Sequence, residues 1–268
     1  MSALLLNTDI RLPDGLCCYE VHLDRDPLIT FDASGNSTVF VAIEGSGTLH
    51  VRTFARRNAH VSYLFWNRGN GEVTIEESHE VMGDAEVVSG YSDCAGHTVK
   101  RNAYMALRGR GAKGTLKSAL LVQKDMDFNL QVINFSPETD GNIENYAVVL
   151  KTGKLMIDAI GKIVKGAKRS TSHQTSRALS MEDGQRSTIL PELLIDENDV
   201  QASHAMSMGR VDEEQLYYMM SRGLSSAQCT ALIASGYLLP ICTLVDDEKM
   251  QESLQKEMEE RIAELCSM

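Results

Sequence analysis

The feature that most constrains the fold is a long series of short runs in which apolar and polar residues alternate. From about residue 19 to residue 203 these runs recur, separated by turn segments such as "NRGNGE" and "ETDGN". Alternation with a period of two is typical of strands with one buried face. The clearest runs are "STVFVAIE" (37–44), "TLHVRTF" (48–54), "HVSYLFW" (60–66), "GEVTIEE" (71–77), "FNLQVINF" (128–135) and "YAVVLKTGKLMI" (146–157).

No amphipathic helix interrupts this series, which argues against a fold that alternates strands with crossover helices. We therefore expect a mainly β body: a barrel, a sandwich or a solenoid. Periodicity alone does not distinguish these three, and the sequence contains no clean repeat of fixed length.

The pattern changes at Asp212 to one typical of helices. "DEEQLYYMMSRG" begins with an acidic residue followed three places later by glutamine, which is a capping-box pattern, and it ends at Gly223. "SSAQCTALIASG" repeats this arrangement, with Ser225 and Gln228 as the box and Gly236 as the predicted stop.

A third helix is predicted from about residue 246 to residue 265. Its apolar stripe is Met250, Leu254, Met258, Ile262 and Leu265. The chain thus divides into an N-terminal segment (1–18), a β core (19–205) and a C-terminal helical domain (206–268).

Composition and net charge limit the classes of partner and the cellular compartment that we expect. The chain has 43% hydrophobic and 24% charged residues and no apolar run near the length needed to cross a membrane. Its start, "MSALLLNTDIRLPDG", is too short and too poorly charged for a secretory signal. A net charge of −11 argues against nucleic acid and anionic membranes as partners. We expect a cytoplasmic protein.

The six cysteines show no disulfide-framework spacing and no CxxC pair, so we expect reduced thiols. Cys94 and His97 have ligand-like spacing, but no second pair lies nearby, and structural zinc sites usually need four ligands. A buried thiol beside a surface imidazole is the favoured interpretation.

Common catalytic motifs are absent from the sequence. "GRGAKG" (109–114) matches GxGxxG, but "TLKSALLVQ" follows it and reads as a strand, so a tight turn is favoured over a dinucleotide loop. The chain has no P-loop motif, no GxSxG and no HExxH. His204 remains as the main candidate. It is either a hydrogen-bonded histidine at a sheet edge or an imidazole that binds a metal or carries a proton.

One segment carries a specific motif. "SHAMSMGRVDEEQLYYMMSRGLSSAQCTALIASGY" resembles the C-terminal signature of the SufB and SufD proteins of the SUF iron–sulfur cluster assembly system. The resemblance extends upstream through "NYAVVLKTGKLMIDAIGKIVKGAKRSTSHQTSRALSM" and "ILPELLIDENDVQASH", and more loosely to "MALRGRGAKGTLKS".

This resemblance implies a right-handed parallel β-helix followed by a C-terminal α-helical subdomain. In the family, two such β-helices associate side by side, and each helical region docks an ABC-type ATPase, SufC. The missing P-loop fits this arrangement, because nucleotide hydrolysis belongs to that partner. The resemblance also implies a compact, core-only member, since family members carry an N-terminal helical domain as well.

Departures from the family pattern imply a SufD-like member. SufB-type members have cysteines where this chain has Met105 and Ser176 or a near neighbour, and a glutamate where it has Ala205. His204 falls on the histidine that SufD-type members contribute at the dimer interface. Because iron–sulfur clusters are held mainly by thiolates, either a cysteine-bearing paralogue completes the site or another thiol such as Cys94 substitutes.

The resemblance therefore implies a non-enzymatic, non-ATPase component of a SUF-type assembly complex, paired with itself or with a SufB-like paralogue. His204 would be a metal or cluster ligand, or a proton carrier. No cofactor is expected to bind tightly, and an iron–sulfur cluster or iron would be held transiently. The alternative is a purely structural adaptor that ligates no metal.

The predicted docking surface for the SufC-like ATPase is the first helix and its flanks. Its candidate residues are Asp212, Glu213, Glu214, Tyr217, Tyr218, Arg222 and Leu224. A third hypothesis, a β-helix enzyme that acts on carbohydrate, requires acidic residues clustered along one β face, and the sequence shows no such cluster.

Overall fold

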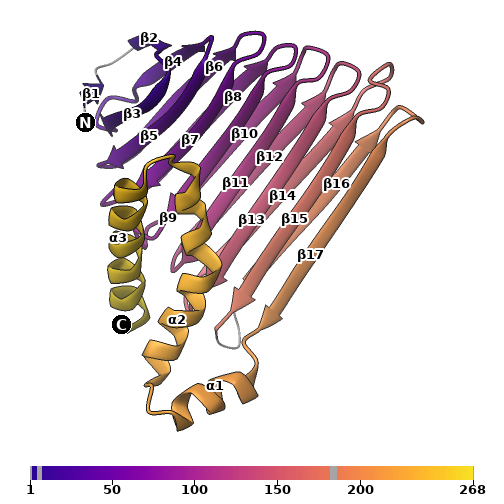
Figure 1. Ribbon diagram of the computed structural model, residues 1–268. Helices are drawn as coiled ribbons and strands as arrows, with labels where there is room; N and C mark the ends of the chain where they lie inside the picture. The colour runs from indigo at the N-terminus through magenta and orange to yellow at the C-terminus, as the bar shows by residue number, and fades with distance from the viewer. Residues whose placement is uncertain (1, 5–7, 182–185, 268) are drawn as a thin grey trace.

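Two parallel sheets form the body of the molecule (Figure 1). The computed structural model describes residues 2–4, 8–181 and 186–267. Within these residues the odd-numbered strands form one sheet, the odd sheet, and the even-numbered strands form the other, the even sheet. The chain changes sheet at every strand and so winds into a parallel β-solenoid. This confirms the expected parallel β-helix and excludes the barrel and the sandwich.

Each sheet is a ladder of parallel pairs. In the odd sheet the order is β1 (Ser2–Leu4), β3 (Gly15–His22), β5 (Asn36–Glu44), β7 (His60–Asn67), β9 (Glu86–Asp93), β11 (Lys113–Val122), β13 (Asp140–Val149), β15 (Thr171–Ser180) and β17 (Gln201–Arg210). In the even sheet it is β2 (Thr8–Leu12), β4 (Leu28–Ala33), β6 (Gly47–Ala55), β8 (Val73–Val81), β10 (Val99–Leu107), β12 (Asp125–Asn134), β14 (Lys154–Ile163) and β16 (Arg186–Ile195).

The coils widen along the chain. Gly15 opposes Ser37 on the next strand of the odd sheet, a spacing of 22 residues. Asp140 opposes Thr171, a spacing of 31 residues. Strand length rises as well, from 5 residues in β2 to 10 residues in β16. Because the spacing changes, the structural repeat leaves no repeat of fixed length in the sequence.

The predicted runs all overlap strands, but one of them is divided. The run 146–157 ends β13 and begins β14, and between them Gly153 donates its backbone N–H to the carbonyl of Leu150 at 2.9 Å. "GRGAKG" contains the turn between β10 and β11, where Gly111 has a φ of +74°, which favours glycine. The tight turn expected there is confirmed.

Alternate side chains of most strands fill the interior. Along β8 every second residue is buried, from Val73 to Val81, and the buried set through most of the solenoid is aliphatic and aromatic. Tyr63 and Phe65 stack along β7 with ring centroids 5.8 Å apart, and Phe31 of β4 lies tilted against Tyr63 with centroids 5.4 Å apart. The strand alternation predicted from the sequence therefore reflects a continuous apolar core.

A charged network interrupts this core at β8 and β10. The side chains of Glu77, His79 and Arg101 are all fully buried. Arg101 Nε donates to Glu77 Oε1 at 2.6 Å, and His79 Nε2 lies 3.0 Å from Glu77 Oε2. Ser89 also donates to Glu77 Oε2, at 2.5 Å. Burial opposes ionisation of Glu77, but the Arg101 charge and these hydrogen bonds outweigh it and lower the pKa of that carboxyl well below its usual range.

The helices follow β17 directly. They are α1 (Glu213–Ser221), α2 (Ser226–Leu238), the 3₁₀ turn η1 (Leu239–Leu244) and α3 (Glu248–Ser267). Asp212 caps α1 by accepting from the Glu214 amide at 2.8 Å, and the capping box of Ser225 and Gln228 is present. The predicted stop at Gly236 is wrong, because α2 continues to Leu238 and leads into η1.

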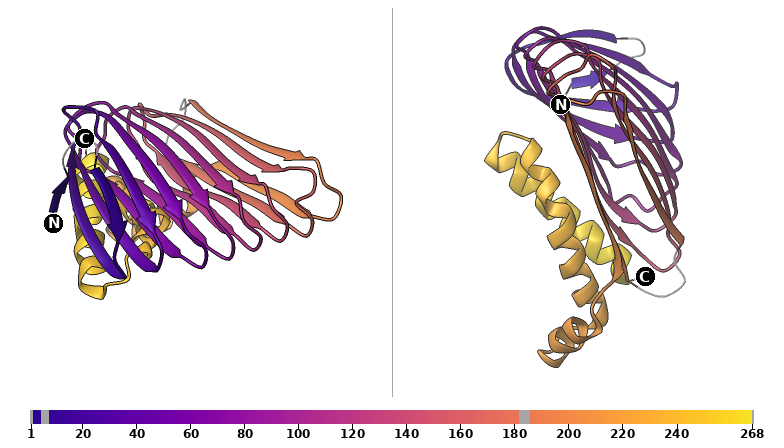
Figure 2. Two further views of the ribbon diagram at one scale, coloured as in Figure 1. Left: turned by 90° about the horizontal axis from the view of Figure 1, so that it is seen from above. Right: turned by 90° about the vertical axis from the view of Figure 1, so that its right-hand side faces the viewer.

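α2, η1 and α3 cover part of the outer face of the odd sheet (Figures 1 and 2). The buried stripe of α3 is Leu254, Met258, Ile262 and Leu265, with Met250 half-buried, and this confirms the predicted stripe. These side chains pack in one cluster with Phe40, Leu64, Trp66 and Leu121 of the sheet. The outward face of the odd sheet is therefore apolar where α3 lies on it.

A polar clamp fixes α3 to the sheet. Arg68 donates twice to Glu257, with both distances 2.6 Å, and Trp66 Nε1 donates to Glu257 Oε1 at 3.0 Å. Burial raises the pKa of Glu257, but the bonds from Arg68 and Trp66 outweigh it and lower that pKa below its usual value. The clamp joins β7 to a helix about 190 residues further along the chain.

One described stretch, Ser226–Leu244, is long and apolar enough to span a membrane. This corrects the expectation that no apolar run approaches that length. Its buried residues Ala234, Leu238 and Cys242 pack against the odd sheet and α3. A single stretch of this kind is weak evidence for a membrane span, because a core helix meets the same criteria.

We expect Glu77→Gln to lower the free energy of unfolding by about 3–5 kcal/mol at pH 7, because it leaves the Arg101 charge buried without its partner. Urea unfolding followed by circular dichroism measures this. The control is Glu80→Gln, whose exposed pair with Arg108 contributes about 1 kcal/mol or less. Equal losses in the two variants would contradict the buried network.

The difference between wild type and Glu77→Gln depends on pH. Because the pKa of Glu77 is lowered on folding, its stabilising contribution is complete above the ordinary value of 4.5 and is lost as the pH falls below it. The same unfolding curves at pH 7 and pH 3 should show the gap narrow. A gap that widens toward pH 3 would contradict this sign.

The single tryptophan of the chain reports on the clamp. We expect Glu257→Ala to lower the free energy of unfolding by about 1–2 kcal/mol and to shift Trp66 fluorescence to the red, because water reaches the indole when α3 loosens. Glu260→Ala on the same helix is the control, since its pair with Lys256 is exposed. An unshifted Glu257→Ala spectrum would show that other contacts hold α3.

Candidate functional site

The last strand of the odd sheet is exposed along its whole length. β17 pairs with β15 along one side and ends the sheet on the other. Each of its ten residues, Gln201–Arg210, is exposed. An exposed edge of this length presents a row of backbone donors and acceptors to a second chain. The wide end of the solenoid therefore presents an exposed backbone edge.

Apolar side chains surround this edge. Met206 and Met208 of β17 are 49% and 46% exposed, and Leu190 and Leu194 of β16 are 43% and 45% exposed. Elsewhere in the described part of the solenoid, large side chains of this kind are mostly buried. Apolar groups gathered at one end typically mark a protein interface.

His204 lies at the mouth of the solenoid interior. Its Cα opposes that of Gln174 on β15, and Gln174 is buried together with Ser172 and Ser176 on the interior-facing side of that strand. The side chains of paired residues on neighbouring parallel strands project from the same face of the sheet. The side chain of His204 therefore leaves the backbone on the interior face, like that of Gln174. Ser203 lies on the outer face, where its hydroxyl is 2.7 Å from Nδ1 of His173.

Cys94 lies far from His204. It follows β9, is 8% exposed, and packs beneath α3 in the cluster that contains Met258 and Leu265. Burial raises the pKa of its thiol well above the usual value. Four strand spacings separate β9 from β17 in the odd sheet, roughly 19 Å. The structure therefore does not bring Cys94 and His204 together.

No alternative ligand set gathers around either residue. Among the residues that the structure describes, no group of three histidine, cysteine or carboxylate side chains could hold a metal ion. His97 and Cys94 line one hollow with Glu257 and Arg261, but Glu257 is engaged by Arg68. Met105 and Ser176, the positions where SufB-type cysteines would stand, are both buried in the solenoid interior.

The predicted docking residues lie on and beside α1, which projects away from the solenoid (Figures 1 and 2). No described residue of α1 is buried, and Tyr217 and Tyr218 are 76% and 59% exposed. Arg222 donates to the Tyr218 hydroxyl at 3.1 Å and lies over its ring. Asp212 caps α1, Glu213 and Glu214 form its first turn, and Leu224 begins the link to α2.

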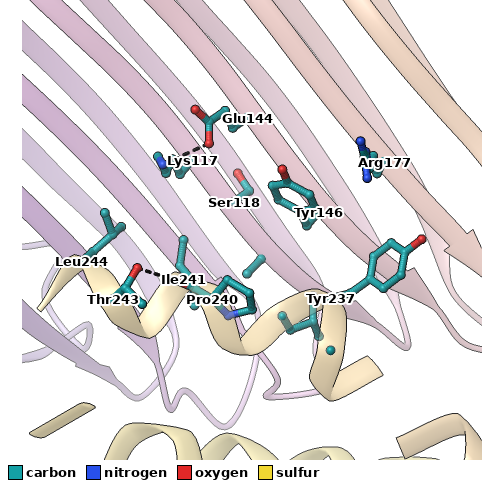
Figure 3. Close-up of a pocket in the computed structure, with 13 residues that line it drawn as sticks. Lys117, Ser118, Glu144, Tyr146, Arg177, Tyr237, Pro240, Ile241, Thr243 and Leu244 are labelled. Carbon is teal, nitrogen blue, oxygen red and sulfur yellow. Dashed lines mark hydrogen bonds and ion pairs between the residues drawn. The ribbon is translucent and has the colours of Figure 1, made fainter. Parts of the chain in front are cut away.

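A cavity of about 380 Å³ lies between the odd sheet and the segment of α2 and η1, as Figure 3 shows. On its sheet side Lys117 pairs with Glu144 at 3.0 Å. Arg177, Tyr146 and Tyr237 line its other end, and Ile241 and Leu244 provide apolar walls. Sequence reasoning missed this cavity, because its residues come from three strands, α2 and η1 without any local motif.

Comparison with known proteins identifies the family. The family model described as "SUF system FeS cluster assembly, SufBD core domain" matches residues 26–237 of this chain. The chain is 34% identical over 169 residues to the iron–sulfur cluster assembly protein SufD of Bacillus subtilis, covering 62% of this chain and 38% of that protein. It is 29% identical over 136 residues to SufB of the same organism, covering 50% and 29%.

A SufBD family protein of Mycobacterium tuberculosis matches over a longer region. It is 26% identical over 241 residues, which is 88% of this chain and 27% of that protein. The chain thus spans well under half the length of these relatives. The match to the core domain covers most of the described solenoid, α1 and nearly all of α2. The chain therefore belongs to the SufBD family of the SUF system.

Proposed function

We propose that this chain is a non-ATPase component of a SUF-type iron–sulfur cluster assembly complex. In this proposal it pairs through the wide end of its solenoid, with a second copy or a SufB-like paralogue, and binds an ABC-type ATPase through α1 and α2. The exposed strand β17, with His204 on its interior face, is the observation that carries the proposal. Family membership supplies the biological process.

Pairing through β17 would complete the solenoid. A partner strand would satisfy the open backbone edge and cover Met206, Met208, Leu190 and Leu194. His204 would then lie between two chains and away from bulk water. In that place its imidazole would act as a ligand to iron or a cluster, or as a proton carrier.

The partner would supply the thiolates. Iron–sulfur clusters are held mainly by cysteine sulfur, and the candidate thiol of this chain, Cys94, is enclosed under α3. A cysteine-bearing paralogue at the same interface would add thiolates to the His204 imidazole. The cluster in this proposal is the cargo of the complex and does not reside permanently in this chain.

Only a short link joins β17 to α1. β17 ends at Arg210 and α1 begins at Glu213, and Arg210 Nη2 donates to Glu213 at 3.2 Å. Val211 is buried, and its amide bonds to the carbonyl of Ser180 on β15. An ATPase that moves α1 would therefore pull on the strand that carries His204. ATP hydrolysis itself would belong to the partner, since the sequence has no P-loop.

A purely structural adaptor is the second candidate. It is favoured by one observation: among the described residues no group of three histidine, cysteine or carboxylate side chains could hold a metal ion. In that case the chain would join the ATPase to a cysteine-bearing paralogue without ligating metal. The first candidate requires His204 as a ligand or proton carrier, whereas the adaptor does not.

We expect replacement of Tyr217 and Tyr218 by alanine to weaken ATPase binding about 30-fold, because exposed tyrosines are frequent energetic centres of interfaces. Co-purification and calorimetry with the SUF-type ATPase measure this. Phe54→Ala is the control, since Phe54 is 47% exposed on the even sheet, away from α1. Binding that survives the double substitution unchanged would place the docking surface elsewhere.

We expect His204→Ala to reduce cluster formation about tenfold when the chain is co-expressed with the ATPase and a cysteine-bearing paralogue, because a ligand or proton carrier is lost. The assay is iron–sulfur absorption of the anaerobically purified complex. His60→Ala is the control, since His60 is exposed on β7. An intact complex with unchanged cluster yield would remove His204 from the mechanism and support the adaptor.

A further inference from the structure

The interior of the solenoid changes character near its wide end. Apart from the buried network around Glu77, the earlier coils are filled mainly by aliphatic and aromatic side chains, whereas the interior row of β15 is mostly polar. Ser172, Gln174 and Ser176 are 1%, 3% and 3% exposed, and Asn145 on the neighbouring β13 is 1% exposed. Buried polar groups almost always have a hydrogen-bond partner, so we expect one for each of these side chains.

Gln174 is held by bonds to the opposite sheet. Its Nε2 donates to the carbonyl oxygens of Ala159 on β14 at 3.1 Å and of Glu192 on β16 at 2.9 Å. Two acceptors on one side identify that side as the nitrogen, which fixes the orientation of the amide. Gly161 leaves the space for it, because a Cβ there would lie 3.0 Å from Gln174 Nε2. The amide is therefore both buried and clamped.

The side-chain oxygen of Gln174 is not used by this clamp. Gln174 Oε1 has no hydrogen-bond partner among the residues that the structure describes. A buried acceptor without a donor costs about 1–3 kcal/mol, so a clamped acceptor of this kind needs a donor in the working state of the protein. The donor must reach an interior position beside β15.

His204 is the ladder neighbour of this residue. Gln174 and His204 oppose each other across the β15–β17 pair, so their side chains start from the same face about 4.8 Å apart. A neutral imidazole has one protonated ring nitrogen, which donates, and one unprotonated ring nitrogen. The hydrogen bond that one ring nitrogen makes determines which of the two carries the proton. In the single chain His204 is exposed, and water competes for that donor.

We propose that Gln174 is a positioning residue for His204. When a partner strand covers β17 and excludes water, Oε1 of Gln174 accepts a hydrogen bond from the imidazole N–H of His204. The bond selects one tautomer and turns the other ring nitrogen, without a proton, toward the interface. There it is ready to bind iron or to accept a proton. This inference rests on the proposed pairing through β17.

The test measures the tautomer of His204 in the paired complex. ¹⁵N NMR of complex labelled in its histidine rings distinguishes the two tautomers, and the His204→Gln variant identifies the His204 signals among those of the 7 histidines. We expect one tautomer in the wild type and a mixture of both in Gln174→Met, which has a similar shape and no acceptor. We also expect Gln174→Met to slow cluster formation about tenfold.

Asn145→Leu is the matched control. It removes another buried amide whose Oδ1 has no partner among the described residues, but Asn145 lies in the ladder row of Ser176 and Met206, one row from His204. We expect a similar loss of thermal stability and an unchanged tautomer. A merely structural role for Gln174 would give the two variants the same spectrum.

The outcomes separate this inference from the function it rests on. If the chain fails to pair, the proposed function and this inference fall together. If it pairs but His204 shows both tautomers in the wild type, only the inference is overturned, and a buried water then accounts for the Gln174 oxygen. That wild-type measurement decides the question even if Gln174→Met does not fold.

Discussion

Backbone hydrogen bonding between successive coils is the interaction on which the rest of the structure depends. In a parallel solenoid each strand finds partners for its N–H and C=O groups only in the coil before it and the coil after it. β17 has the coil before it, through β15, and within the described residues it ends the sheet. The exposed edge, the surrounding methionines and leucines, and the open mouth of the interior all follow from that position.

The parts of the fold that sequence reasoning recovered are those encoded locally. Period-two alternation indicated the strands, and the capping box at Ser225 and the stripe through Leu254 and Met258 indicated helices that the structure confirms. The division of the run 146–157 was missed, because its turn contains only one glycine between two apolar stretches. The continuation of α2 past Gly236 was missed for a similar reason: a glycine inside a well-packed helix does not end it.

The parts that remained hidden depend on which residues meet across coils. Glu77 and Arg101 are 24 residues apart, and Gln174 and His204 are 30 residues apart, so neither spacing predicts the other. Because the coils widen, the register has to be known strand by strand. The contact between Arg68 and Glu257 is more distant still. His204 stood out as the remaining candidate once common motifs were found absent, and the family resemblance favoured a functional role for it; its assignment stays a prediction.

The widening of the coils also bears on how many molecules can join. A solenoid of constant perimeter can stack its last coil on the first coil of another copy, and such a head-to-tail contact repeats without end. Here the strands at the two ends differ in length, 5 residues in β2 against 10 in β16, so a wide coil finds no matching ladder at a narrow end. The taper of the described solenoid therefore disfavours a head-to-tail contact that would repeat into a fibre.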